Sequence, residues 1–269
     1  MSQAMRCIIV TAAGWYDERK KTLGRLLEQI PEATVLTSRR PEHSSVWARR
    51  AWELAEEWDE PTVILNDDVF VCPDFLNVCE RVVAAAPGRT ISLHTSLPQA
   101  AQASGSWVRS YWLTGPGYIL PRGVPTQLLD YWSKLPPRYG PNEDNVAIQW
   151  AWERQEPFWS TVPAIVKHDT ATSSTLGYDD HKLRTCSVSW EDRPGPWNWS
   201  DGAAAPPFIE NPWANSVALE ARRMALHSGH PCQMCWTRGA VVGNAGLEMC
   251  GQCLGSVVLP VLNSLRGAQ

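Results

Sequence analysis

The N-terminal part of the sequence constrains the fold most, because two apolar runs flank one amphipathic segment. Residues 6–12 form a short apolar run that predicts a buried strand. In residues 17–30 apolar side chains recur at helical spacing, and residues 34–37 predict a second strand. A strand, a helix and a strand in this order are typical of a parallel sheet whose ligand site lies at the carboxyl ends of its strands. The sequence therefore predicts an α/β fold.

The rest of the chain divides into three parts. Further helices are predicted at residues 44–58, from residue 73 and at 142–154, and further strands at 62–65, 69–71, 90–94 and 110–120. Beyond this region the sequence becomes rich in Pro, Gly and Trp without a clear period. We therefore expect a main domain at 1–188, a linker or extended wrap at 189–215, and a small second module at 216–269.

The composition excludes some classes of protein. Apolar residues make up 44% of the chain and charged residues 19%, which excludes bulk disorder. The net charge of −4 argues against a protein that coats nucleic acid with its whole surface, so any such contact is confined to a patch. The first apolar run is short and charged residues follow it, so it is typical of a strand and not of a signal peptide. No stretch approaches the roughly 20 apolar residues of a membrane span. We expect a cytoplasmic protein without a membrane partner, in the host cytoplasm if it is viral.

An acidic motif, Asn66-Asp67-Asp68, directly follows the predicted strand at 62–65. Adjacent carboxylates at a sheet edge form a site of hard oxygen ligands, where Mn²⁺ or Mg²⁺ is held while diphosphate oxygens and water fill the remaining positions. Such a site binds a nucleoside diphosphate. The alternative is a solvated turn after a strand.

The surrounding string VILNDDVFVCPDFL resembles the "DxD" segment of GT-A glycosyltransferases. The resemblance implies a Rossmann-like, mostly parallel sheet and metal-dependent transfer of a sugar from a UDP- or GDP-sugar to a hydroxyl group. Asn66 departs from the family pattern at its first acidic position. The implied metal ligand is therefore Asp68, and Asp67 is implied as a contact to the donor.

Three later segments resemble the same family, in the family's order. The segment YWLTGPGYIL resembles the glycine-containing strand that lines the sugar pocket, which implies Gly117 as a donor contact. Glu143-Asp144 resembles the acidic element that contacts the acceptor hydroxyl or acts as its base, although a helix N-cap is the alternative. VKHD resembles the segment whose histidine completes the metal site, so His168 should approach the same cation as Asp68. A lone histidine would otherwise be structural.

The ends of the first two strands supply candidates for the nucleotide pocket. Thr11 and Ala12 follow the first strand, and Arg39 follows the second. A guanidinium group suits bidentate contacts with phosphate. The alternative for Arg39 is a surface charge.

Four cysteines near the C-terminus form two CxxC pairs separated by fourteen residues: Cys232, Cys235, Cys250 and Cys253. This spacing predicts a structural Zn²⁺ site of the zinc-ribbon kind, and a redox dithiol is the alternative. The module either has a purely structural role, in which it closes the C-terminus onto the main domain, or contacts nucleic acid. The modest basicity around the cysteines favours the nucleic-acid contact.

A zinc ribbon that contacts DNA would link the two halves of the chain. The combined hypothesis is a transferase that attaches sugar to a 5-hydroxymethylpyrimidine in DNA, as bacteriophage DNA-modifying glycosyltransferases do. A polysaccharide or small-molecule acceptor, and a non-catalytic nucleic-acid-binding protein, stay open. A nucleotidyltransferase would normally show a glycine-rich phosphate loop after the first strand, and Gly14 alone does not supply one.

Overall fold

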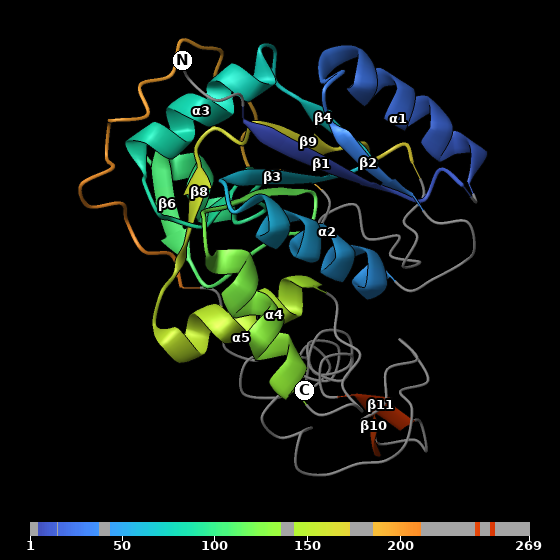
Figure 1. Ribbon diagram of the computed structural model, residues 1–269. Coiled ribbons are helices and arrows are strands. Elements are labelled where there is room, and N and C mark those ends of the chain that lie inside the picture. The colour runs from blue at the N-terminus through green and yellow to red at the C-terminus, as the bar shows by residue number, and fades with distance from the viewer. Residues whose placement is uncertain are drawn as a thin grey trace, which may run out of the picture.

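The chain folds around one sheet with helices on both faces (Figure 1). The structure, a computed structural model, describes residues 5–14, 16–37, 44–135, 143–172 and 185–210, and the backbone of 240–242 and 248–250. Within these ranges, no helix combines the length and the apolar character that crossing a membrane requires.

The main sheet has seven strands in the order β2-β1-β3-β7-β5-β8-β6. The strands are β1 (Arg6–Thr11), β2 (Thr34–Thr37), β3 (Thr62–Asn66), β5 (Ile91–Ser92), β6 (Trp107–Ser110), β7 (Gly117–Leu120) and β8 (Phe158–Thr161). The pairings make β1, β2, β3, β5 and β8 run in one direction and β6 and β7 in the other. The α/β class with a mostly parallel sheet, predicted from the sequence, is confirmed.

The neighbouring strands β1 and β3 end side by side. Val10 is opposite Asn66 in their parallel ladder, and Thr11 is opposite Thr37 of β2 on the other side. The residues that follow β1 and β3 therefore meet at one edge of the sheet.

Alternation along the central strands divides the core into two layers. Ile9 and Leu65 pack in the layer formed by α1 (Asp17–Gln29) and α3 (Phe75–Ala85). Their neighbours Ile8 and Ile64 belong to the opposite layer, because successive side chains of a strand point to opposite faces. That layer contains α2 (Ser44–Trp58), α4 (Val124–Lys134) and α5 (Glu143–Arg154). Figure 1 shows these two groups of helices on opposite sides of the sheet.

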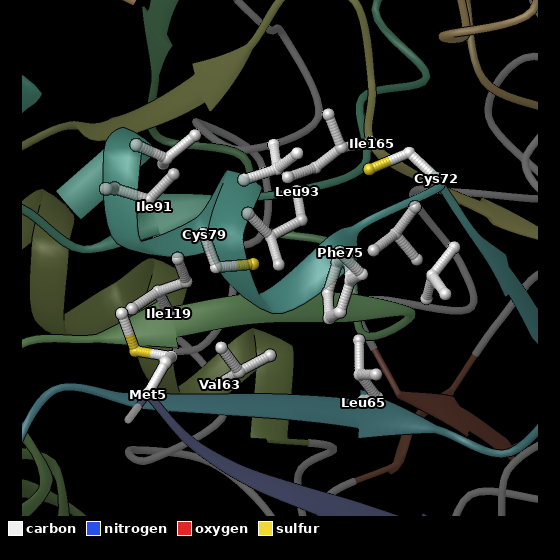
Figure 2. Packing of buried hydrophobic residues seen from close by; sticks show 14 of the residues in the cluster. Met5, Val63, Leu65, Cys72, Phe75, Cys79, Ile91, Leu93, Ile119 and Ile165 are labelled. Atoms are coloured by element: carbon white, nitrogen blue, oxygen red, sulfur yellow. The ribbon is translucent and has the colours of Figure 1, made fainter. Parts of the chain in front are cut away.

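The layer under α3 is densely packed (Figure 2). Phe75 and Cys79 of α3 point toward Val63 and Leu65 of β3, and all four side chains are buried. Fixed packing of this kind holds the carboxyl end of β3, and hence the acidic motif, in a defined position.

A second, smaller sheet lies next to the acidic motif. It consists of β4 (Val69–Val71) and β9 (Val166–His168), which pair antiparallel. Val69 is opposite His168, although they are far apart in the sequence. This ladder carries the predicted histidine to the residues that follow the acidic motif.

The described segment 185–210 covers the edge of the main sheet at β6 (Figure 1). The Arg109 N–H donates to the carbonyl of Pro207 at 2.8 Å, and the Ile209 N–H donates to the carbonyl of Arg109 at 2.7 Å. The indole of Trp107 donates to the carbonyl of Trp199 at 2.7 Å. Covering an edge strand in this way satisfies backbone groups that would otherwise be open to pairing with another chain.

One predicted strand is wrong. The sequence indicated a strand over residues 110–120 that Gly115-Pro116-Gly117 interrupts, but β6 ends at Ser110 and β7 begins only at Gly117. Pro116 has no N–H to donate to a ladder, and its carbonyl instead accepts a hydrogen bond from the Asn66 N–H at 3.1 Å. The intervening loop reaches the acidic motif as a result.

Two short strands are described near the C-terminus. β10 (Ala240–Val242) pairs antiparallel with β11 (Glu248–Cys250), and Ala240 is opposite Cys250. Cys232, Cys235 and Cys253 lie outside the described residues, as does the side chain of Cys250. The zinc site therefore stays a prediction.

Candidate functional site

Asp67 is buried in a network that joins the ends of β1 and β3. Its Oδ2 accepts hydrogen bonds from the Thr11 hydroxyl at 2.7 Å and from the Ala12 N–H at 2.9 Å. Its Oδ1 lies 2.6 Å from Nη1 of Arg19, in the first turn of α1. Burial raises the pKa of Asp67, while the charge of Arg19 and these hydrogen bonds oppose that shift. Asp67 thus fastens two strands and a helix to one another.

Asp68 is also buried, but its carboxylate faces a different set of groups. Its Oδ2 lies 3.1 Å from Nη1 of Arg19 and 3.6 Å from Nδ1 of His168. Its backbone carbonyl accepts a hydrogen bond from the Asp169 N–H at 2.7 Å, which continues the pairing of β4 with β9. The structure therefore brings Asp68 and His168 together, as the sequence predicted.

The Asp68–His168 pair fits a divalent cation in part. Nδ1 of His168 is buried and has no hydrogen-bond partner among the described residues, so its lone pair is available to a metal. A separation of 3.6 Å lets both atoms bind one ion. Within the described ranges, however, no three His, Cys, Asp or Glu side chains are arranged to hold a metal. These two residues would hold the cation only with further ligands, such as diphosphate oxygens and water.

His94 lies directly behind His168. The two imidazole rings make an edge-on contact with centroids 5.6 Å apart. Nδ1 of His94 is 3.2 Å from the carbonyl of Val166 on β9, and the side chain is fully buried. Burial lowers the pKa of His94 to about 3, with the neighbouring His168 adding to the shift. A neutral His94 therefore supports the ring of His168.

Glu143 approaches the acidic motif from the other side, at the start of α5. A Cβ added to Gly115 would lie 3.4 Å from Oε1 of Glu143 and 3.5 Å from Nδ2 of Asn66. Gly115 thus separates these two side chains, and its missing Cβ leaves space between them. Oε2 of Glu143 is buried and has no hydrogen-bond partner among the described residues.

The two acidic residues of α5 have different surroundings. Oδ1 of Asp144 accepts a hydrogen bond from the Asn145 N–H at 2.8 Å, which engages it with the start of the helix. Burial, with the charge of Asp144 added, raises the pKa of Glu143 to about 7. Burial also raises the pKa of Asp144 to about 6. Because Asp144 is engaged with the helix start while Oε2 of Glu143 has no hydrogen-bond partner among the described residues, Glu143 is the better placed to accept a proton.

The predicted donor contacts are distributed unevenly. Thr11 and Ala12 lie at the site, but each donates to Asp67. Gly117 packs against core side chains, since a Cβ there would be 2.8 Å from Cδ2 of Leu65 and 3.1 Å from Val166. Arg39 lies outside the described residues.

Sequence reasoning did not single out Arg19, His94 or Gly115 as site residues. Arg19 is one of four basic residues in α1, and no local pattern distinguishes it from its exposed neighbour Lys20. His94 comes at the end of a predicted strand, where a histidine is usually structural. Only Gly115 carried a signal, since it belongs to the Gly-Pro-Gly interruption of the predicted strand.

Comparisons with known proteins give limited information. No family model matches the sequence, and no curated protein matches it either. Among solved structures, the protein A197 from STIV is 13% identical, over 61% of this chain and 84% of its own, with a TM-score of 0.39. Mannose-1-phosphate geranyltransferase from Thermus thermophilus is 12% identical, over 85% and 82%, with a TM-score of 0.36. These values assign neither an activity nor a ligand. The fold itself is α/β, with a mixed and mostly parallel sheet.

Proposed function

We propose that the protein is a metal-dependent glycosyltransferase that uses a nucleotide-sugar donor. One observation carries the proposal: two distant segments bring complementary groups to the end of β3. The ladder of β4 and β9 brings His168 to within 3.6 Å of Asp68. The start of α5 brings Glu143 to the Asn66 side of the same motif, across Gly115.

The two sides of the motif suit the two halves of a glycosyl transfer. Asp68 and His168 would hold Mn²⁺ or Mg²⁺, which neutralises the charge of the leaving diphosphate when it is bound. Glu143 accepts the proton of the acceptor hydroxyl as that oxygen forms its bond with the anomeric carbon. The bond between the anomeric carbon and the diphosphate breaks in the same reaction. The raised pKa of Glu143 suits a base that works near neutral pH.

The loop after β1 favours glycosyl transfer over nucleotidyl transfer. A nucleotidyltransferase needs backbone N–H groups of this loop to cradle phosphates. Here the Ala12 N–H donates to Asp67, and the Ala13 N–H donates to the Thr11 hydroxyl at 2.9 Å. Two N–H groups of the loop are therefore engaged within the protein.

For the acceptor we propose a 5-hydroxymethylpyrimidine in DNA. The support is the predicted zinc ribbon with basic residues around it, joined in one chain to the candidate transferase site. An acceptor base must leave the duplex or come from a single strand before its hydroxyl can reach Glu143.

A donor screen tests the function. Purified full-length protein is incubated with Mn²⁺, single UDP- or GDP-sugars and DNA that contains 5-hydroxymethylcytosine, and the DNA is analysed by mass spectrometry. We expect sugar transfer by the wild type and loss of transfer, by at least about 100-fold, in Asp68→Ala. Glu53→Ala is the matched control, because Glu53 is an exposed carboxylate on α2 whose partner is Arg49.

Each outcome distinguishes one part of the proposal. Donor hydrolysis without labelled DNA keeps the transferase and excludes the DNA acceptor. Release of pyrophosphate from a nucleoside triphosphate and a sugar phosphate would instead establish nucleotidyl transfer. Undiminished transfer by Asp68→Ala would contradict the proposed metal ligand.

A further inference from the structure

Arg19 is a buried cation at the centre of the acidic motif. Its side chain is only 3% exposed, and its Nη1 is 2.6 Å from Oδ1 of Asp67 and 3.1 Å from Oδ2 of Asp68. A buried guanidinium group is costly unless it is paired, so two carboxylates at these distances hold it firmly. The one positive charge of Arg19 thus forms ion pairs with both acidic residues.

The same oxygen of Asp68 has a second neighbour. Nδ1 of His168 lies 3.6 Å from this Oδ2, and the proposed cation would bind these two atoms. A divalent cation that binds Oδ2 of Asp68 would therefore lie close to the positive charge of Arg19, which contacts the same oxygen. Like charges this close in a buried site repel strongly, because little water screens them.

Arg19 has a second partner, Asp67, with which it can stay paired when it leaves Asp68. Asp67 is fixed by Thr11 and Ala12, so its contact with Arg19 does not depend on Asp68. We infer that Arg19 competes with the divalent cation for Asp68: it closes the site when no cation is bound, and withdraws onto Asp67 when one binds. Arg19 is thereby a positioning residue that sets the cation affinity. The inference rests on the proposed function, since it concerns the same cation.

The protein offers a matched control on the same helix. Arg25 of α1 also pairs with a carboxylate near the site, with its Nη2 3.2 Å from Oδ2 of Asp169. The substitutions Arg19→Met and Arg25→Met therefore remove the same charge from the same helix, but only the first removes it from Asp68. Arg25 also donates to the Val69 carbonyl and lies over the Phe70 ring, so Arg25→Met controls for the loss of charge and of local packing on α1.

Titration of the full-length protein with Mn²⁺, followed by electron paramagnetic resonance of the free ion, tests the inference. We expect Arg19→Met to bind Mn²⁺ roughly tenfold more tightly than the wild type, since the ion pair between Arg19 and Asp68 no longer opposes binding. Arg25→Met should stay within about twofold of the wild type, as the lost contact is not to Asp68. Asp68→Ala gives the background from other sites.

Two further measurements cover a variant that folds poorly. Arg19→Lys keeps a single point charge that cannot bridge both carboxylates, so it should bind Mn²⁺ with intermediate affinity. Added Mn²⁺ should also raise the melting temperature of Arg19→Met more than that of the wild type.

Equal or weaker binding by both Arg19 variants, with normal binding by the wild type, overturns the inference and keeps the proposed cation. No Mn²⁺ binding above the Asp68→Ala background in any of these proteins overturns both.

Discussion

Three consecutive residues at the end of β3 have three different environments. Asn66 faces Gly115 and Glu143, Asp67 faces the end of β1, and Asp68 faces β9. Asn66 ends β3, and Asp67 and Asp68 form the bend before β4, so one short motif contacts several elements at once. Each residue of the motif can therefore serve a separate purpose.

Glu143 should make the stability of the protein depend on pH. Its pKa is raised from 4.5 to about 7 in the folded state, so the folded protein binds this proton more tightly than the unfolded chain. The contribution of Glu143 to the free energy of unfolding is therefore greatest below pH 4.5 and is lost as the pH rises through about 7. The variant Glu143→Gln carries no such proton.

Urea unfolding at pH 5 and pH 8 measures this effect. We expect the wild type to lose stability relative to Glu143→Gln between the two values, because Asp144 ionises in both proteins and Glu143 ionises in the wild type alone. A difference between the two proteins that stays constant with pH would contradict the environment described for Glu143.

At the scale of elements, the packing of β7 against β3 and β9 places the loop that contains Gly115. Gly117 begins β7, where its bare backbone lies against Leu65 and Val166. Close approach of this kind is available only to glycine. The residue that the family resemblance connects with the donor therefore also has a packing role.

Replacing Gly117 by alanine should destabilise the fold. The new Cβ would lie 2.8 Å from Cδ2 of Leu65, a side chain that is fully buried and cannot swing away. We expect a loss of about 1–3 kcal/mol in the free energy of unfolding, as overpacking usually costs. Gly24→Ala is the matched control, since a Cβ there meets nothing within 4 Å and lies in α1. It should stabilise the protein by about 0.5–1 kcal/mol. Equal effects of the two substitutions would refute this explanation.

At the scale of the whole molecule, the predicted zinc module should melt separately from the main domain. Cys232→Ser removes one of four predicted ligands, so about one equivalent of Zn²⁺ should be lost, as measured by metal analysis. The main sheet should keep its melting transition, because residues between Met5 and Ile209 form the core described around it. Retention of zinc by the variant would show that these cysteines are not its ligands.

The sequence by itself determined most of the elements of the main domain. The helix at 44–58 and the strands at 34–37 and 69–71 have the predicted bounds, because the helix has a clear apolar period and each strand is a short apolar run flanked by turn residues or charged groups. The acidic motif was placed at a strand end for the same reason. Local patterns suffice where the signal is contained in neighbouring residues.

The sequence also indicated that His168 approaches Asp68, but through resemblance to a family. The physical cause is the ladder of β4 with β9, which places His168 opposite Val69. The pattern of residues within β4 or β9 does not specify that these two strands pair with each other. Their pairing depends on how the rest of the chain folds and packs around them.

Only the tertiary structure decided which charges occupy the site. Arg19 looks like an ordinary helix-surface cation in the sequence, yet it is buried between Asp67 and Asp68. Its position depends on where α1 packs on the sheet, and the pairing of a buried charge depends on groups that are distant in the sequence. The sequence therefore determined which elements form and which chemistry they carry, whereas the packing of the elements decided which side chains meet.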